Sequence, residues 1–169
     1  MKIIGIVMAI VVISLSWMAA PLPVFSESGQ IHWYGYQEGI ERMKTEKKKG
    51  FLHFYTTWCK YCKVMDANTF ANARVIGYLN ENFISMRINA EVDTAVARIY
   101  GANKFPDNWF LTEEAANIGS RPGYIPPEDL LNLLTYVHSN DYKNITFNAF
   151  LEKQKGGSPQ KPGDTSKSK

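Results

Sequence analysis

The feature that most constrains the fold is a pair of cysteines, Cys59 and Cys62, which follows a short aromatic and apolar run at residues 51–55. They are the only cysteines among 169 residues, so a scaffold held by several disulfides is excluded. Stability must therefore come from apolar burial, and a hydrophobic content of 45% is high enough for it. The length predicts one globular domain with its own core.

The rest of the chain alternates between patterns typical of strands and patterns typical of helices. Apolar residues at helical spacing predict helices, and short apolar or alternating runs predict strands. This alternation predicts an α/β fold in which helices cover both faces of a central sheet. We expect strands at residues 51–55, 83–88 and 109–111, the last paired with a partner around 118, and helices at 36–49, 59–67, 75–79, 92–100, 130–137 and 147–151.

Both ends of the chain differ in charge from its body. Lys2 precedes an apolar run at 3–20, and the stretch 153–169 carries five lysines against one Asp. Between them lie 13 Lys and Arg residues against 15 Asp and Glu, so the net charge of +3 comes from the ends. A basic folded face is not indicated, and we expect no nucleic-acid partner.

One positive charge followed by an apolar run predicts an export signal at residues 1–26, cleaved near its end. The run also rivals a membrane-spanning helix in length, so an uncleaved inner-membrane anchor is the alternative. Either way, we expect the domain at 27–152 to lie in a periplasmic or otherwise exported compartment, where thiols tend to be oxidised. From Gly156 onward the chain has no apolar residue, and we expect 153–169 to be a disordered basic tail.

The spacing C-x-x-C places both sulfurs on the first turn of the helix predicted after the strand. The sulfurs can then form a bridge, and unpaired backbone N–H groups together with the helix dipole favour a thiolate at Cys59. Lys60 and Lys63 add positive charge nearby. We expect Cys59 to attack, and Cys62, one turn inward and less exposed, to resolve the mixed disulfide.

Two other interpretations of the cysteine pair are open. A zinc site would need two more ligands, but His32, His53 and His138 form no paired arrangement, and the chain has no second C-x-x-C. A static bridge closing so small a loop would add little stability. We therefore expect redox chemistry that uses no metal and no cofactor.

Three segments resemble thioredoxins, in the right order and spacing. Residues 51–63, with the sequence FLHFYTTWCKYCK, are similar to the active-site strand and helix of that family. Residues 100–106, followed by Trp109, are similar to its cis-proline loop, and residues 123–128 to its last strand-to-helix passage. The resemblance covers roughly residues 31–137 and implies a thioredoxin fold with a central mixed β-sheet. It is closest to exported thiol–disulfide oxidoreductases of bacteria.

The resemblance also implies roles for single residues. Trp58 would shield the site, and Lys60 and Tyr61 form the inner pair between the cysteines. Pro106 would lie against the disulfide with a cis bond before it, a feature that tertiary structure must enforce. Phe105 would offer backbone groups to a bound polypeptide.

The chain departs from the thioredoxin pattern beneath the second cysteine and after the proline. His53 stands where thioredoxins have a buried Asp, and the Lys partner of that Asp falls at Arg87. His53 is either a hydrogen-bonded core residue or the base that takes the proton of Cys62, with Arg87 keeping it neutral by repulsion. Asp107 stands where thioredoxins usually have Thr, and its effect on substrate preference is left open.

These patterns predict a monomeric thiol–disulfide oxidoreductase that acts on exported proteins with disulfides. Reduction, with recharging by a membrane electron donor, is the leading direction. The alternative is a thioredoxin-like binding module or chaperone, for a protein or a metal ion, without redox turnover. Exposed Met and Tyr side chains, or the tail, would then carry the function.

Overall fold

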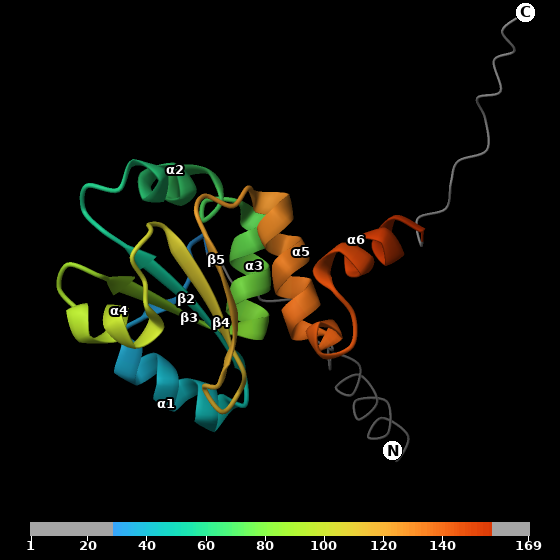
Figure 1. Cartoon of the computed structure of the whole chain (residues 1–169), viewed down its shortest axis with the longest axis horizontal. Coiled ribbons are helices and arrows are strands. Elements are labelled where there is room, and N and C mark those ends of the chain that lie inside the picture. Colours follow the sequence, from blue (N-terminus) through green and yellow to red (C-terminus); the bar gives the residue numbers. More distant parts are fainter. Residues whose placement is uncertain (1–28, 157–169) are drawn as a thin grey trace, which may run out of the picture.

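The computed structural model describes residues 29–156 (Figure 1). The export signal predicted at 1–26 and residues 157–169 of the predicted tail lie outside this part of the chain. Across the described range, no helix is both long enough and apolar enough to cross a membrane. Helix α6 continues to Gly156, so the tail predicted from residue 153 begins as part of a helix.

Five strands form one mixed sheet in the order β1-β3-β2-β4-β5. The first three of these run parallel, and β4 runs antiparallel to both β2 and β5. This arrangement confirms the expected α/β class with a mixed sheet. The strands are β1 (Trp33–Tyr34), β2 (Lys49–Tyr55), β3 (Phe83–Asn89), β4 (Asp107–Leu111) and β5 (Asn117–Pro122).

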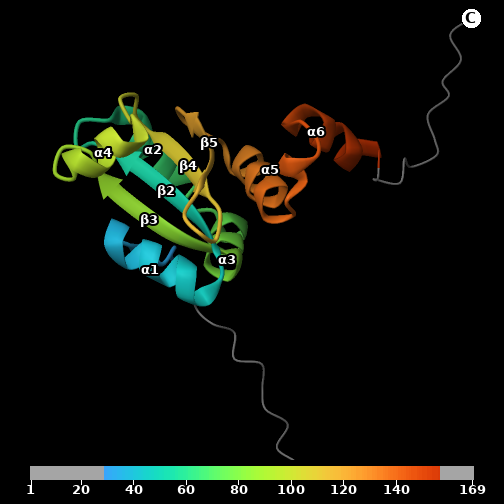
Figure 2. The ribbon, with the colours of Figure 1, turned by 60° about the horizontal axis from the view of Figure 1, so that its bottom comes forward.

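Helices cover both faces of the sheet, as the two views of the ribbon show (Figures 1 and 2). Helices α1 and α4 pack on one face, and α2, α3 and α5 pack on the other. The helices are α1 (Tyr36–Glu46), α2 (Lys60–Asn68), α3 (Ala73–Asn82), α4 (Thr94–Tyr100), α5 (Pro127–His138) and α6 (Phe147–Gly156), with a 3-10 turn, η2, at Asp141–Lys143.

Strand β2 is central, and its position explains its apolar sequence. It pairs with β3 on one side and β4 on the other, and helices lie above and below it. Six of its seven residues are buried, so the strand cannot show the apolar–polar alternation of a half-exposed strand. Phe51 packs toward α3 and α5, while Leu52 and Phe54 pack toward α1 and α4.

The sequence missed β1, because two residues are too few to form a recognisable pattern. The strand nevertheless pairs with β3 through Trp33 and Tyr34. The Trp33 ring packs edge-on against Phe70, which follows α2, with 5.1 Å between the ring centroids. The described fold therefore extends one strand further toward the N-terminus than the predicted elements.

Candidate active site

Three segments meet at one edge of the sheet, beyond the carboxyl ends of β2 and β3 and the beginning of β4. The first links β2 to α2, the second follows β3, and the third runs from α4 to Pro106. Gly101 ends α4 with a φ of 64°, a left-handed conformation that glycine adopts without steric cost. The Ala90 N–H donates to the Tyr55 carbonyl at 2.9 Å, which joins the first two segments.

The two cysteines lie at the beginning of α2 and are joined by a disulfide. The S–S distance is 2.07 Å and the Cα–Cα distance is 5.3 Å. Cys59 is the N-cap residue, and its Sγ accepts a hydrogen bond from the Cys62 N–H at 3.0 Å. The same N–H and the helix dipole can stabilise negative charge on Cys59 Sγ when the bridge is reduced.

The expected contrast in exposure between the two cysteines is not present in the disulfide form. Cys59 is 3% exposed and Cys62 is 2% exposed, because the bond holds both sulfurs against the first turn of the helix. Their neighbours are the exposed groups: Trp58 is 69% exposed and Tyr61 is 61% exposed. Lys60 also points into solvent, as does Lys63.

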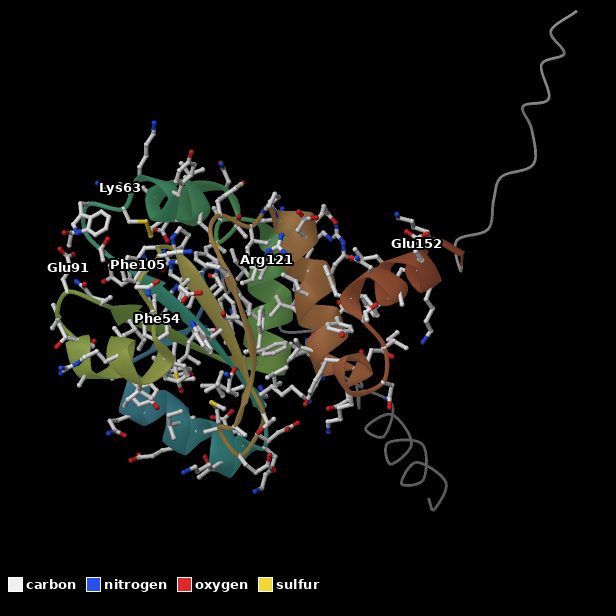
Figure 3. The ribbon with its side chains drawn as sticks, viewed as in Figure 1. Phe54, Lys63, Glu91, Phe105, Arg121 and Glu152 are labelled. Carbon is white, nitrogen blue, oxygen red and sulfur yellow. A yellow bond between two sulfur atoms is a disulfide. The ribbon has the colours of Figure 1, made fainter. Side chains whose placement is uncertain are left out.

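Aromatic and acidic side chains lie in the segments next to the cysteines, and Phe105 and Glu91 are on the side of the molecule where α2 begins (Figure 3). The rings of Trp58 and Phe105 meet edge to face, with 6.1 Å between their centroids. Glu91 accepts a hydrogen bond from the Thr57 N–H through its Oε2. This backbone bond lowers the pKa of Glu91, which favours its carboxylate form. Glu91 lies 34 residues from Thr57 in the chain, so no local pattern could have revealed it.

The peptide bond between Phe105 and Pro106 is cis. The Pro106 carbonyl accepts a hydrogen bond from the Gly123 N–H at 2.7 Å, which ties the proline to the end of β5. Next to Phe105, α4 and the segment that follows it line an open groove of about 390 Å³. Its lining includes Ala90, Ala97, Arg98, Gly101 and Ala102.

His53 is completely buried on the face of β2 that α2 and α3 cover. Its ring packs edge-on against Phe70, with 4.8 Å between the centroids. Burial lowers the pKa of His53 to about 4, so the imidazole is neutral at pH 7. We expected repulsion by Arg87 to keep His53 neutral, but that repulsion is a smaller cause than burial.

Arg87 is placed beside His53 by the pairing of β3 with β2, and its charge has a partner. Its Nη2 donates to Asp66 Oδ2 on α2 at 2.8 Å, and the guanidinium lies 4.6 Å from the ring centroid of Tyr55. Sequence reasoning missed Asp66. Its spacing from Cys62 was the available signal, because residues four apart lie on the same face of a helix.

Asn108 was also missed, although it is fully buried and contacts His53 directly. Its Oδ1 lies 2.9 Å from His53 Nδ1, and its Nδ2 donates to the carbonyls of Arg121 and Gly123. Strand register aligns Arg87, His53, Asn108 and Arg121 across four strands. We call these four residues the polar row.

Asp107 follows the cis-proline and is 5% exposed. Its Oδ2 accepts a hydrogen bond from Trp109 Nε1 at 2.9 Å. Burial raises the pKa of Asp107, against the opposing effect of the Trp109 bond. Asp107 pairs with Phe54 across the sheet and alternates in direction with Asn108, so it lies on the face opposite the polar row.

Within residues 29–156, no group of three or more His, Cys, Asp and Glu side chains is arranged to hold a metal ion. The three methionines in this range, Met43, Met65 and Met86, are all buried. The exposed Met side chains suggested for a binding module are therefore absent from the described residues. Tyr61 remains as an exposed aromatic residue beside the disulfide.

Comparisons with known proteins agree with this geometry. Residues 36–138 match the sequence profile of the thioredoxin-like domain family. A thioredoxin from Thermus thermophilus has a similar structure, with a TM-score of 0.60 at 22% identity, over 64% of this chain and 87% of the other. The expected thioredoxin fold is thus confirmed.

The chain is also similar to parts of two much longer animal proteins. It is 29% identical over 115 residues to an uncharacterised protein of Caenorhabditis elegans, over 63% of this chain and 16% of that protein. It is 30% identical over 109 residues to spermatogenesis-associated protein 20 of Rattus norvegicus, over 59% of this chain and 14% of the rat protein. The family match covers more than half of the chain, so this chain belongs to the thioredoxin-like domain family.

Proposed function

We propose that this protein is a thiol–disulfide oxidoreductase that reduces disulfides in exported proteins. The observation that carries the proposal is the Cys59–Cys62 disulfide at the beginning of α2, where Cys59 Sγ accepts a helix N–H. This geometry allows the bridge to open and allows a thiolate to be stabilised in the same place.

The reaction begins with the dithiol form. The Cys59 thiolate attacks one sulfur of a client disulfide, and the second client sulfur leaves as a thiolate. Cys62 then loses its proton and attacks Cys59 Sγ, which re-forms the internal disulfide and releases the first client sulfur. Two electrons pass from the dithiol to the client, and both client thiolates take up protons. A membrane electron donor would restore the dithiol.

We assign His53 the role of base for Cys62. Cys62 and Asp66 lie four residues apart on α2, and Asp66 reaches down to Arg87, the β3 neighbour of His53. The inward face of α2 thus lies over this part of the sheet. A buried neutral imidazole there has one ring nitrogen, Nε2, without a hydrogen-bond partner among the described residues, and this nitrogen can accept the thiol proton.

The surface around the disulfide supports the proposal that the client is a protein, through Trp58, Phe105 and the groove beside Phe105. Trp58 and Tyr61 are largely exposed beside a disulfide that is itself buried. An incoming chain can cover both rings, and the groove can receive its side chains. The backbone of Phe105 would bind the client next to its disulfide.

A non-redox binding module is the second candidate, and the same exposed aromatic rings favour it. Reduction of insulin with dithiothreitol separates the two. We expect the wild type to accelerate insulin precipitation and Cys59→Ser to abolish the acceleration. Equal rates for both proteins would support the binding module.

The direction of the reaction is tested by the reduction potential. We expect equilibration with glutathione to place the purified domain well below about −120 mV, the value typical of a strong oxidant. A potential at that level would reverse the assignment from reductase to oxidase.

The clients and the compartment are tested by trapping. In cells, Cys62→Ser should hold mixed disulfides on Cys59, and mass spectrometry should identify exported proteins in them. The matched control is Cys59→Ser with Cys62 intact, which should trap little. A client set of cytoplasmic proteins would contradict the exported role.

A further inference from the structure

The buried amide of Asn108 has a fixed orientation. Its Nδ2 lies 3.1 Å from the Arg121 carbonyl oxygen and 3.3 Å from the Gly123 carbonyl oxygen. If the amide were rotated by half a turn, its own oxygen would face two carbonyl oxygens and neither contact could be a hydrogen bond. The amide nitrogen must therefore face the two carbonyls, which leaves Oδ1 toward His53.

This orientation decides which nitrogen of His53 carries the hydrogen. Oδ1 of Asn108 is an acceptor and lies 2.9 Å from His53 Nδ1, so Nδ1 must donate. In a neutral imidazole the other nitrogen, Nε2, then holds a lone pair. Nε2 is buried and has no hydrogen-bond partner among the described residues.

We propose that Asn108 is a positioning residue that holds His53 in the Nδ1–H tautomer, so that Nε2 is free to take the proton of Cys62. This inference rests on the proposed oxidoreductase function and adds a requirement to it. Without Asn108, the hydrogen could move to Nε2, and that nitrogen could no longer accept a proton from the thiol.

The other polar groups around His53 do not compete for its Nδ1. Arg87, from β3, donates to Asp66 and covers the Tyr55 ring. Asp66, from α2, receives that bond, and the Tyr55 ring is stacked parallel to the imidazole at 6.4 Å. Asp66 Oδ1 is buried and has no partner in the described structure, which makes Asp66 the rival base to be tested.

The same amide is connected to the cis-proline segment. Gly123 accepts a bond from Asn108 and donates its N–H to the Pro106 carbonyl. Asn108, His53 and Pro106 are thus joined by successive hydrogen bonds from the core to the client-binding edge. Arg121 lies at the outer end of the polar row (Figure 3), and its backbone carbonyl accepts a hydrogen bond from Asn108 Nδ2.

In the mixed disulfide, the proton of Cys62 passes to His53 as Cys62 attacks Cys59. The Cys62 S–H bond breaks, its proton binds Nε2, and the sulfur lone pair forms the bond to Cys59 Sγ. The client sulfur leaves with the electron pair of the broken bond. Imidazolium at His53 then returns the proton to the client thiolate or to water, which regenerates the Nδ1–H tautomer.

Nuclear magnetic resonance of protein labelled with nitrogen-15 in histidine tests the tautomer directly. We expect the wild type to show His53 with hydrogen on Nδ1 from pH 6 to 8, in both the oxidised and reduced forms. Asn108→Leu should give a mixture of tautomers or the Nε2–H form. Hydrogen on Nε2 in the wild type would overturn the proposal, whatever the activity.

The rate at which Cys62 resolves the mixed disulfide tests whether the tautomer of His53 affects the reaction. Reduced protein reacts with Ellman's reagent in two phases: attack by Cys59, and release of the second aromatic thiol by Cys62. We expect Asn108→Leu to slow only the second phase, by about tenfold, because general bases contribute about 10²–10⁴-fold and part of this is lost. Asn108→Thr should restore most of the rate, since its hydroxyl can accept from Nδ1 and donate to a carbonyl.

Two further variants separate a tautomer effect from a packing effect. In a His53→Leu background, Asn108→Leu should have no additional effect on the second phase. Asn148→Leu, the same change at an exposed position on α6, should leave both phases unchanged. If Asp66→Asn slows the second phase and His53→Leu does not, Asp66 is the base and the role of Asn108 is wrong.

The two levels of the inference fail in different ways. If Asn108→Leu folds and reacts like the wild type in both phases, the positioning role is wrong and the oxidoreductase function stands. If the wild type gives neither phase with Ellman's reagent after reduction, the oxidoreductase function itself fails.

Discussion

The two faces of the sheet differ in what they bury near the cysteines. The face under α1 and α4 is apolar along β2 and β3, with Leu52, Phe54 and Met86 fully buried, and Asp107 is buried on it at the beginning of β4. The face under α2, α3 and α5 holds the apolar cluster around Phe51, and near the cysteines the polar row crosses it. His53 and Asn108 are as deeply buried there as the apolar residues on the other side.

This difference shows that His53 and Asn108 occupy core positions at which apolar side chains would be expected. An apolar pair at the positions of His53 and Asn108 would need no partners, whereas the polar pair must satisfy each buried donor and acceptor. Both polar atoms of the Asn108 side chain have hydrogen-bond partners, but His53 Nε2 has none among the described residues. A free buried nitrogen is costly in a structural role and useful in a catalytic one.

The largest expected effect concerns the apolar face. Leu52→Ala leaves a cavity between the sheet and its covering helices, and we expect it to lower the free energy of unfolding by about 3 kcal/mol. Urea denaturation at pH 7 measures this. The second phase with Ellman's reagent, measured on the folded fraction, should stay within twofold of the wild type. A loss below about 1 kcal/mol would show that this face is not the main source of stability.

A second prediction concerns pH and the polar row. The pKa of His53 falls from 6.5 to about 4 on folding, so between these values the unfolded chain binds more protons than the folded one. Stability from keeping His53 neutral is therefore fully present above about pH 6.5 and is lost as the pH falls toward 4. The loss should approach about 3 kcal/mol, at 1.36 kcal/mol for each pKa unit.

Urea denaturation at several pH values, for the wild type and for His53→Leu, isolates this contribution. The difference in unfolding free energy between the two proteins should be constant above about pH 6.5 and change steadily from there to pH 4. Leu52→Ala is the matched control on the opposite face, and it should keep the pH dependence of the wild type. A constant difference between the wild type and His53→Leu would mean that His53 titrates normally when folded.

The ion pair between Arg87 and Asp66 should have a smaller effect, because both side chains are partly exposed. We expect a double-mutant cycle with Arg87→Met and Asp66→Leu to give a coupling energy of about 1 kcal/mol. Raising the salt concentration should reduce it only slightly, since partly buried pairs are screened less than surface pairs. If the cycle gives no measurable coupling energy, the contacts of Arg87 with aromatic rings, and not its ion pair with Asp66, hold the side chain in place.

The smallest effect concerns the charges outside both faces. Lys60 and Lys63 are exposed, so their attraction to a thiolate at Cys59 is weakened by water and salt. Replacing both with Gln should slow alkylation of Cys59 at pH 7 by about fivefold or less, because exposed charge pairs contribute about 0.2–1 kcal/mol. A much larger decrease in the alkylation rate would mean that the lysines, and not the N-terminus of α2, are the main groups that stabilise the Cys59 thiolate.

Several parts of the site could be predicted from the sequence, because each depends on residues close together in the chain. The apolar run of β2 next to C-x-x-C predicted a strand followed by a helix beginning at Cys59. His53 interrupted that apolar run and so stood out as a special position. The spacing also predicted that Cys62 is less exposed than Cys59, whereas in the closed bridge both cysteines are buried, at 2% and 3% exposed.

Other parts depend on residues that are far apart in the chain. Asn108 lies 55 residues from His53, and Glu91 lies 34 residues from Thr57. Neither residue belongs to a local pattern that distinguishes it from an ordinary loop or strand residue. Only the register between β2 and β4, and the meeting of three segments at one sheet edge, bring them to the site.

The sequence by itself determined the order of strands and helices from α1 onward and the placing of two sulfurs on one helical turn, because apolar periodicity and residue spacing act over a few residues. Only the tertiary structure decided which partner His53 has, which of its nitrogens is free, and that burial contributes more than Arg87 to keeping it neutral. Hydrogen-bond direction and desolvation depend on groups brought together from four separate strands, and no one-dimensional pattern records them.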